Sequence, residues 1–127
     1  MKTVAMALFP DFLLLDMAGP LEVFSIANRY LPAAQHYQIV TIGTEPGALR
    51  ASNGVEVQTD LLLDQAHGAY DVLLVPGGPG AYNECHPALL PWLKAVAPQA
   101  RRYGSICTGA FVLGHAGLLD GHRVTTH

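Results

Sequence analysis

The sequence predicts an α/β domain of the flavodoxin-like kind, in which helices cover both faces of a parallel sheet. Strand-like apolar runs alternate with helical patterns along the chain, as they do when helices connect parallel strands. Half of the 127 residues are hydrophobic and only 13% are charged, which favours elements buried on both sides. No repeat, linker or low-complexity tract interrupts the chain, so residues 1–127 are expected to form one domain.

The predicted strands are short runs of apolar, β-branched or aromatic residues. They occur at 4–9, 37–42, 71–75, 102–106 and, as the start of one more strand, 123–126. The runs 4–9 and 71–75 are almost wholly apolar, which is typical of strands covered on both faces. Around Asn53-Gly54 we expect a short hairpin that joins 49–52 to 55–58.

Helical patterns fill the intervals between these strands. They occur at 11–30, 88–100 and 108–116, with a brief helix or turn at 60–66. Proline is tolerated in a first helical turn, so the first helix is expected to begin near Pro20. Pro91 and Pro98 limit the second helix, and Gly117 stops the third.

Charge and composition narrow the classes of function. The formal charge of −3 argues against a broad nucleic-acid surface within this segment, so any DNA contact would come from elsewhere. No secretory signal is visible, and no apolar run approaches the roughly 18 residues that span a bilayer. We therefore expect a cytoplasmic protein without membrane contact, in which Cys85 and Cys107 stay reduced.

Cys107 is the sharpest candidate for a functional residue. A predicted strand runs directly into it, and Thr108-Gly109-Ala110 then opens a helix with small side chains. Small residues let strand and helix pack around a tight turn that pushes the central side chain outward, as in a nucleophile elbow. A thiol at a helix N-terminus also favours the thiolate form. The alternative is a buried structural cysteine, which is common.

Two further segments are expected at the same edge of the sheet. Gly77 and Gly78 follow a buried strand, and the amides of Gly78 and Thr108 could form an anion or oxyanion site; the alternative is only a tight turn. Asp16 follows three leucines, so its carboxylate is expected in a partly desolvated place, where it could hold a proton or accept a hydrogen bond from the thiol. Its alternative role is to cap the helix near Pro20, and Glu22 is a competing carboxylate.

The histidines do not predict a metal site. They are scattered along the chain without a pair at helical ligand spacing and without a nearby pair of cysteines: His36, His67, His86, His115, His122 and His127. We expect neither a metal nor another cofactor.

Five segments together resemble the ThiJ/PfpI branch of the class I glutamine amidotransferase-like superfamily. They are 15–24, 71–78, 106–110, 116–121 and 125–127. The resemblance implies a nucleophilic Cys107, an acid or base at Asp16, hydrogen bonding by Thr108 and assembly into a homodimer. It also implies that the fold continues beyond Thr125-Thr126-His127, so the C-terminal part of the fold is expected to be missing from this chain.

Two subgroups of this family share the observed combination of segments. One is the N-terminal, small-molecule-sensing domain of AraC-type transcriptional regulators, which bind DNA through a C-terminal module that this chain does not contain. The other is isonitrile hydratase, a lyase that adds water to an isonitrile to give an N-substituted formamide. Ala27-Asn28 and the sequence 110–113 favour the regulator, with the hydratase as the alternative.

Other activities are less compatible with the residues around Cys107. Protease-like members of the family carry histidine where Thr108 stands, which disfavours peptidase and amidotransferase activity. Glyoxalase-like members use glutamate near the first strand, where this chain has Asp16. A third hypothesis is a sensor domain in which Cys107 is oxidised.

Overall fold

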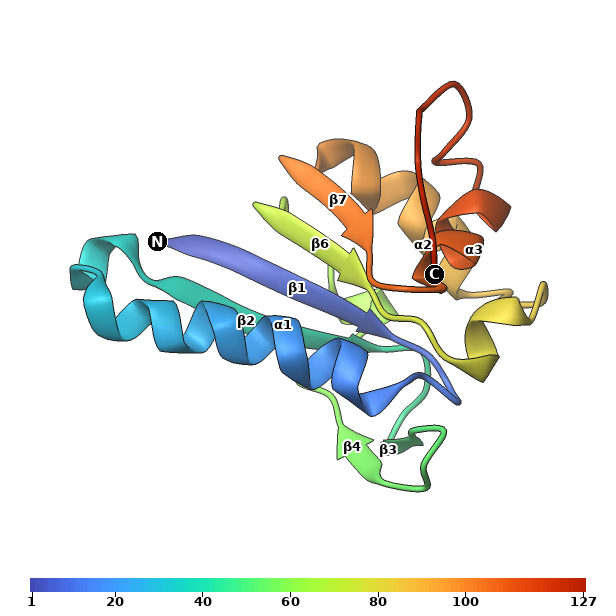
Figure 1. Ribbon diagram of the computed structural model, residues 1–127, viewed down its shortest axis with the longest axis horizontal. Coiled ribbons are helices and arrows are strands. Elements are labelled where there is room, and N and C mark those ends of the chain that lie inside the picture. The colour runs from blue at the N-terminus through green and yellow to red at the C-terminus, as the bar shows by residue number, and fades with distance from the viewer.

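Five parallel strands form the central sheet of the computed structural model, which describes residues 1–127 (Figure 1). In spatial order they are β5 (Leu61–Leu62), β2 (Tyr37–Gly43), β1 (Lys2–Leu8), β6 (Val72–Val75) and β7 (Arg102–Ser105). A separate antiparallel hairpin pairs β3 (Ala48–Arg50) with β4 (Glu56–Gln58). The predicted parallel sheet and hairpin are confirmed.

Three α-helices cover the sheet: α1 (Leu14–Ala27), α2 (Leu89–Val96) and α3 (Gly109–His115). The connection from β1 to β2 and that from β6 to β7 move across the sheet in opposite directions, so right-handed crossovers place α1 and α2 on opposite faces. Figure 1 shows α1 alongside β1 and β2, while α2 and α3 lie beside β7. None of these helices has the length and apolar run that crossing a membrane would require.

Short 3-10 helices complete the connections between strands and helices. They are Asn28–Tyr30, Ala33–Gln35, Leu63–Gln65, η4 (Pro79–Tyr82) and Ala97–Gln99. The core itself is built around β1, because that strand has a neighbour on each side and a helical layer on each face. Every side chain from Val4 to Phe9 is completely buried. Phe12, Leu73 and Leu93 belong to the same hydrophobic core.

One local prediction is wrong and another holds only in part. Residues 123–126 form no strand and lie exposed in an irregular segment, because a β-branched run becomes a strand only where it finds a partner ladder. The brief helix or turn predicted at 60–66 is present as the 3-10 helix Leu63–Gln65, but Leu61–Leu62 before it pairs with the end of β2 as the edge strand β5.

The first helix begins at Leu14 rather than near Pro20. Leu13 N–H donates to Gly77 O at 2.8 Å and Asp16 N–H donates to Leu13 O at 3.0 Å, so contact with the loop after β6 defines its first turn. Pro20 therefore lies inside the helix, at the cost of one backbone hydrogen bond. Asp16 lies within the first turn and does not act as the N-cap, which is Leu13.

Asn28 joins the end of α1 to the beginning of β2. Its Nδ2 donates to Tyr37 O at 2.9 Å, and Tyr37 N–H donates to its Oδ1 at 2.7 Å. Asn28→Ala removes both bonds and leaves the two backbone groups unpaired, so we expect a loss of about 2 kcal/mol in the free energy of unfolding. Urea denaturation measures this loss, and Asn28→Asp, which keeps the acceptor alone, should fall between the two. Equal stability of Asn28→Ala and the unchanged chain would contradict the prediction.

Candidate functional site

The loops after β1 and β6 close on each other at the carboxyl edge of the sheet. This is the topological switch point, because the connection from β1 runs to β2 on one side of the sheet and the connection from β6 runs to β7 on the other. Besides the bond between Leu13 and Gly77, Gly80 N–H donates to Asp11 O at 3.1 Å, and Asp11 adopts a left-handed φ of 61°. Backbone hydrogen bonds thus join the two loops. The candidate site lies on the side of these bonds that faces β7.

Cys107 occupies a sharp turn between β7 and α3, as predicted. Its φ of 54° lies in the left-handed region, which a non-glycine residue adopts at a cost of about 1–3 kcal/mol. The turn is tied on both sides: Ile106 N–H donates to Val75 O at 2.9 Å, and Gly109 N–H donates to Ile106 O at 3.0 Å. The thiol is free and its residue half-buried, whereas Cys85 is exposed.

Two glycines allow the Cys107 turn and the loop after β6 to approach each other. A Cβ at Gly109 would lie 2.3 Å from Val75 O, and one at Gly77 would lie 2.6 Å from Thr108 Oγ1 and 2.9 Å from Asp16 Oδ2. Real Cβ atoms essentially never come this close to other atoms. The close packing of small residues that the sequence predicts around Cys107 is therefore present.

A buried polar cluster lies against this turn. Gly77 N–H donates to Asp16 Oδ2 and Gly78 N–H donates to Thr108 Oγ1, each at 3.0 Å. Asp16 is only 8% exposed and Thr108 only 5%. The fold thus brings Asp16, Thr108 and both glycines together, with the carboxylate in the desolvated place expected of it. No hydrogen bond joins the Cys107 thiol to Asp16.

The backbone amides of this cluster differ in their availability to a ligand. Those of Gly77, Gly78 and Gly109 already donate within the chain. The N–H of Thr108 has no acceptor in the chain. Of the amides considered for an anion or oxyanion site, that of Thr108 is therefore the one open to an incoming group.

Other titratable candidates lie away from this cluster. Glu22 is exposed on α1 and His115 is exposed on α3. His86 is buried, packs edge-on against Phe9 at 5.3 Å and has its Nε2 3.0 Å from Gly80 O, which is a structural arrangement. No group of three histidine, cysteine, aspartate or glutamate side chains is placed to hold a metal ion.

The C-terminal segment supplies a contact that the sequence did not predict. Thr126 Oγ1 donates to Cys107 O at 3.0 Å. The signal in the sequence was the segment 125–127, which is one of the five that carry the family resemblance, but a run of threonines does not reveal what the hydroxyl binds.

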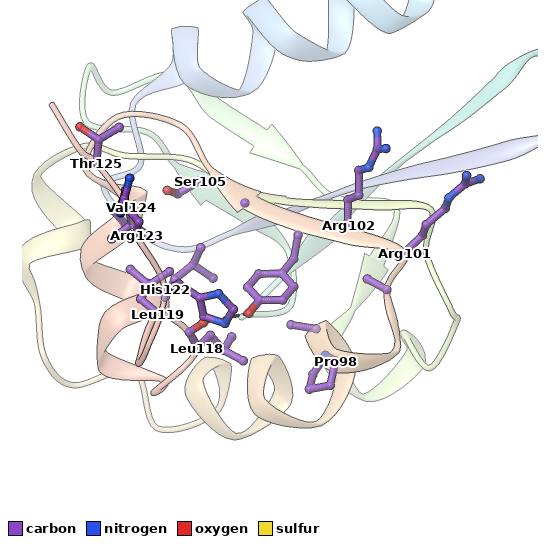
Figure 2. Close-up of a pocket in the computed structure, with 16 residues that line it drawn as sticks. Pro98, Arg101, Arg102, Ser105, Leu118, Leu119, His122, Arg123, Val124 and Thr125 are labelled. Atoms are coloured by element: carbon purple, nitrogen blue, oxygen red, sulfur yellow. Dashed lines mark hydrogen bonds between the residues drawn. The ribbon is translucent and has the colours of Figure 1, made fainter.

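A cavity lies on the outer side of β7, between this strand and residues 118–125. It has a volume of about 560 Å³ (Figure 2). Figure 2 shows Arg101 and Arg102 at one end of it and Ser105 with Thr125 towards the other. Neither Cys107 nor Asp16 lines it, so this cavity adjoins the turn without containing the thiol.

Comparison with known proteins gives a match over nearly the whole chain. The sequence profile of the DJ-1/PfpI family matches residues 2–127. An uncharacterized protein encoded in the cpoL 5' region of Streptomyces lividans is 42% identical, with 98% of this chain and 86% of that protein covered. The HTH-type transcriptional regulator GbdR of Pseudomonas aeruginosa is 32% identical, over 99% of this chain and 34% of the regulator. Isonitrile hydratase of Pseudomonas putida is also 32% identical, over 98% of this chain and 51% of the hydratase.

Solved structures share the fold at lower sequence identity. A ThiJ/PfpI family protein from Pseudomonas syringae superimposes with a TM-score of 0.86 at 22% identity, over 99% of this chain and 50% of that one. An AraC family transcriptional regulator from Pseudomonas putida gives a TM-score of 0.84 at 24% identity, over all of this chain and 67% of the regulator. The chain thus spans about a third of GbdR and about half of the hydratase.

Proposed function

Because the chain belongs to the DJ-1/PfpI family, we propose that it is the small-molecule-sensing domain of an AraC-type transcriptional regulator. The observation that carries this proposal is the match of 99% of the chain to a third of GbdR, which leaves two thirds of such a regulator for other modules. In this proposal DNA is bound by a helix-turn-helix module on the C-terminal side, and the protein works in the cytoplasm.

The polar cluster beside Cys107 supports sensing. No hydrogen bond joins the thiol to a histidine or to Asp16, whose Oδ2 accepts from Gly77 N–H. The free N–H of Thr108 offers a hydrogen bond to an acceptor atom of a ligand. We place the ligand against Cys107, Asp16 and Thr108, with the Gly77–Gly78 turn as one wall.

The complete reading frame tests the regulator proposal directly. We expect it to encode two helix-turn-helix segments after His127, and the purified product to shift DNA from its own promoter region in a gel assay. A frame that closes after a short segment which only completes the sheet would remove the proposal and leave the enzyme as the better candidate.

The second candidate function is hydration of an isonitrile, favoured by Cys107, Asp16 and Thr108 lying at one edge. The Cys107 thiolate adds to the terminal isonitrile carbon, and that carbon takes a proton from the Asp16 carboxyl group to give a thioimidate. Water then adds to the thioimidate carbon and the C–S bond breaks. The products are the free thiol and an N-substituted formamide, so that one water is consumed in each cycle.

Asp16→Asn separates the structural role of this residue from its chemical role. The amide retains an oxygen that accepts from Gly77 N–H, so the free energy of unfolding should stay within about 1 kcal/mol of the unchanged chain. Proton transfer is lost, so hydration of an alkyl isonitrile, followed by NMR of the formamide, should slow about a hundredfold or more. Asp16→Glu, which keeps an acid, serves as the control. Full turnover in the asparagine variant would exclude Asp16 as the proton donor.

The proposed homodimer uses the outer side of α1. Most residues of this helix are apolar, Glu22 and Ser25 being its exposed polar ones, and its only buried residue is Asp16. Leu15 is 71% exposed and Val23 67%, and Ile26 is exposed beside them. Because several large apolar side chains exposed on one helix are typical of an interaction surface, we assign this side to contact with a second copy.

Val23→Lys should convert the dimer to a monomer in sedimentation-velocity analysis, since it places a charge among the exposed apolar side chains of the proposed interface. Val55→Lys, an exposed valine before β4 of the hairpin, is the matched control and should leave the dimer intact. Identical sedimentation of both variants would exclude α1 as the contact.

A further inference from the structure

Residues 122–127 return from the end of α3 to the Cys107 turn. In Figure 1 the C-terminus lies beside α3, next to the segment that leaves β7. Within this segment His122 N–H donates to Leu119 O, and Thr126 Oγ1 donates to Cys107 O at 3.0 Å. Thr126 therefore makes the one hydrogen bond by which residues 123–127 are attached to the rest of the chain.

The carbonyl of Cys107 depends on this hydroxyl. The neighbouring backbone N–H groups donate to other carbonyls: Gly109 N–H donates to Ile106 O, and Phe111 N–H donates to Thr108 O. No other donor in the chain reaches Cys107 O. The left-handed φ of Cys107 directs its carbonyl out of the helical pattern, where only Thr126 meets it.

The same peptide group carries the free N–H of Thr108. A hydrogen bond to a peptide oxygen polarises the whole group, which makes its N–H a stronger donor. The Thr126 hydroxyl thus acts on both functional parts of the turn: it holds the peptide that follows the thiol, and it strengthens the amide that is open to a ligand.

We propose that Thr126 is a positioning residue for the Cys107 turn, which it holds in the left-handed conformation that directs the thiol outward. The proposal rests on the proposed function only in taking Cys107 as the working group. Thr126 itself touches no reacting atom. Its neighbour Thr125 makes no hydrogen bond to the turn and provides the matched control.

Three variants of the chain test this role: Thr126→Val, Thr126→Ser and Thr125→Val. In ¹⁵N-HSQC spectra, Thr126→Val should move the Thr108 amide nitrogen upfield, because its peptide group loses a hydrogen bond at oxygen. Mass spectrometry gives the rate of iodoacetamide alkylation at Cys107 divided by the rate at exposed Cys85. In Thr126→Val this ratio should fall about three- to tenfold, the factor expected for one net hydrogen bond. Both values should return in Thr126→Ser and stay unchanged in Thr125→Val.

The proposal is overturned if Thr126→Val leaves the Thr108 resonance and the ratio of alkylation rates unchanged. It is equally overturned if serine fails to restore them, or if Thr125→Val has the same effect. Neither measurement uses a ligand, DNA or an isonitrile, so the results of both are independent of the regulator proposal. If the NMR and alkylation changes are observed but the reading frame encodes no DNA-binding module, the regulator proposal is excluded and the positioning role of Thr126 stands.

Discussion

Replacing Cys107 with alanine is expected to remove the function of the site while leaving the fold intact. The side chain is half-buried and its thiol makes no hydrogen bond, so the free energy of unfolding should change by no more than about 1 kcal/mol. Isonitrile hydration should fall by on the order of a thousandfold or more, since no other nucleophile lies at the turn. Under the regulator proposal, Cys107→Ala should also abolish the change in promoter activity that the sensed small molecule causes.

Cys85→Ala is the matched control for this experiment. Cys85 is the other free thiol of the chain, is exposed, and lies in the loop between η4 and α2, away from the polar cluster. The Cys85→Ala variant should retain both isonitrile hydration and the change in promoter activity. Full activity of Cys107→Ala by both measures would show that the turn has a purely structural role.

Gly109→Ala is expected to have the largest effect on stability, a loss of about 3 kcal/mol in the free energy of unfolding. The added methyl group would lie 2.3 Å from Val75 O and 2.7 Å from Pro76 O. Both atoms belong to the backbone at the end of β6, which has β1 and β7 on either side and cannot move aside as a flexible side chain would.

Gly114→Ala, in the same helix, measures the effect of alanine without this contact. Its methyl group would meet only Leu119 Cδ1 at 3.9 Å, an ordinary contact, so helix propensity should raise stability by up to about 1 kcal/mol. Urea unfolding of both variants gives the comparison. A midpoint for Gly109→Ala equal to that of the unchanged chain would mean that the turn opens to accept the methyl group, and the close approach would not be obligatory.

The order of elements was predictable because most of them are set by local patterns. The apolar runs at 4–9 and 71–75 are long enough and apolar enough to be strands only inside a sheet, and the structure places them as β1 and β6 at its centre. The failures occur where a distant contact decides the outcome. The start of α1 is defined by Gly77, 63 positions after Leu14, and no local pattern near Pro20 contains that information.

At the site, residue types were predictable and hydrogen-bond partners were not. The small residues after Cys107 predicted its sharp turn, and the three leucines before Asp16 predicted burial of that carboxylate. The sequence also favoured the amide of Gly78 as an oxyanion donor, but in the structure Thr108 Oγ1 accepts from it. Which acceptor an amide finds depends on side chains brought together from separate loops, and this arrangement exists only after folding.

In the proposed dimer, the bond between Gly77 and Asp16 would couple ligand binding at the site to association of the subunits. Asp16 lies in the first turn of α1, and the outer side of the same helix is the proposed dimer surface. A ligand that takes the Asp16 oxygen would displace Gly77 N–H and so remove one of the two hydrogen bonds between the start of α1 and the loop after β6, leaving the bond from Leu13 N–H to Gly77 O. By linkage, the factor by which the ligand changes the affinity between subunits is also the factor by which assembly changes the affinity for the ligand. The concentration of the protein is then itself a variable that sets how tightly the ligand binds.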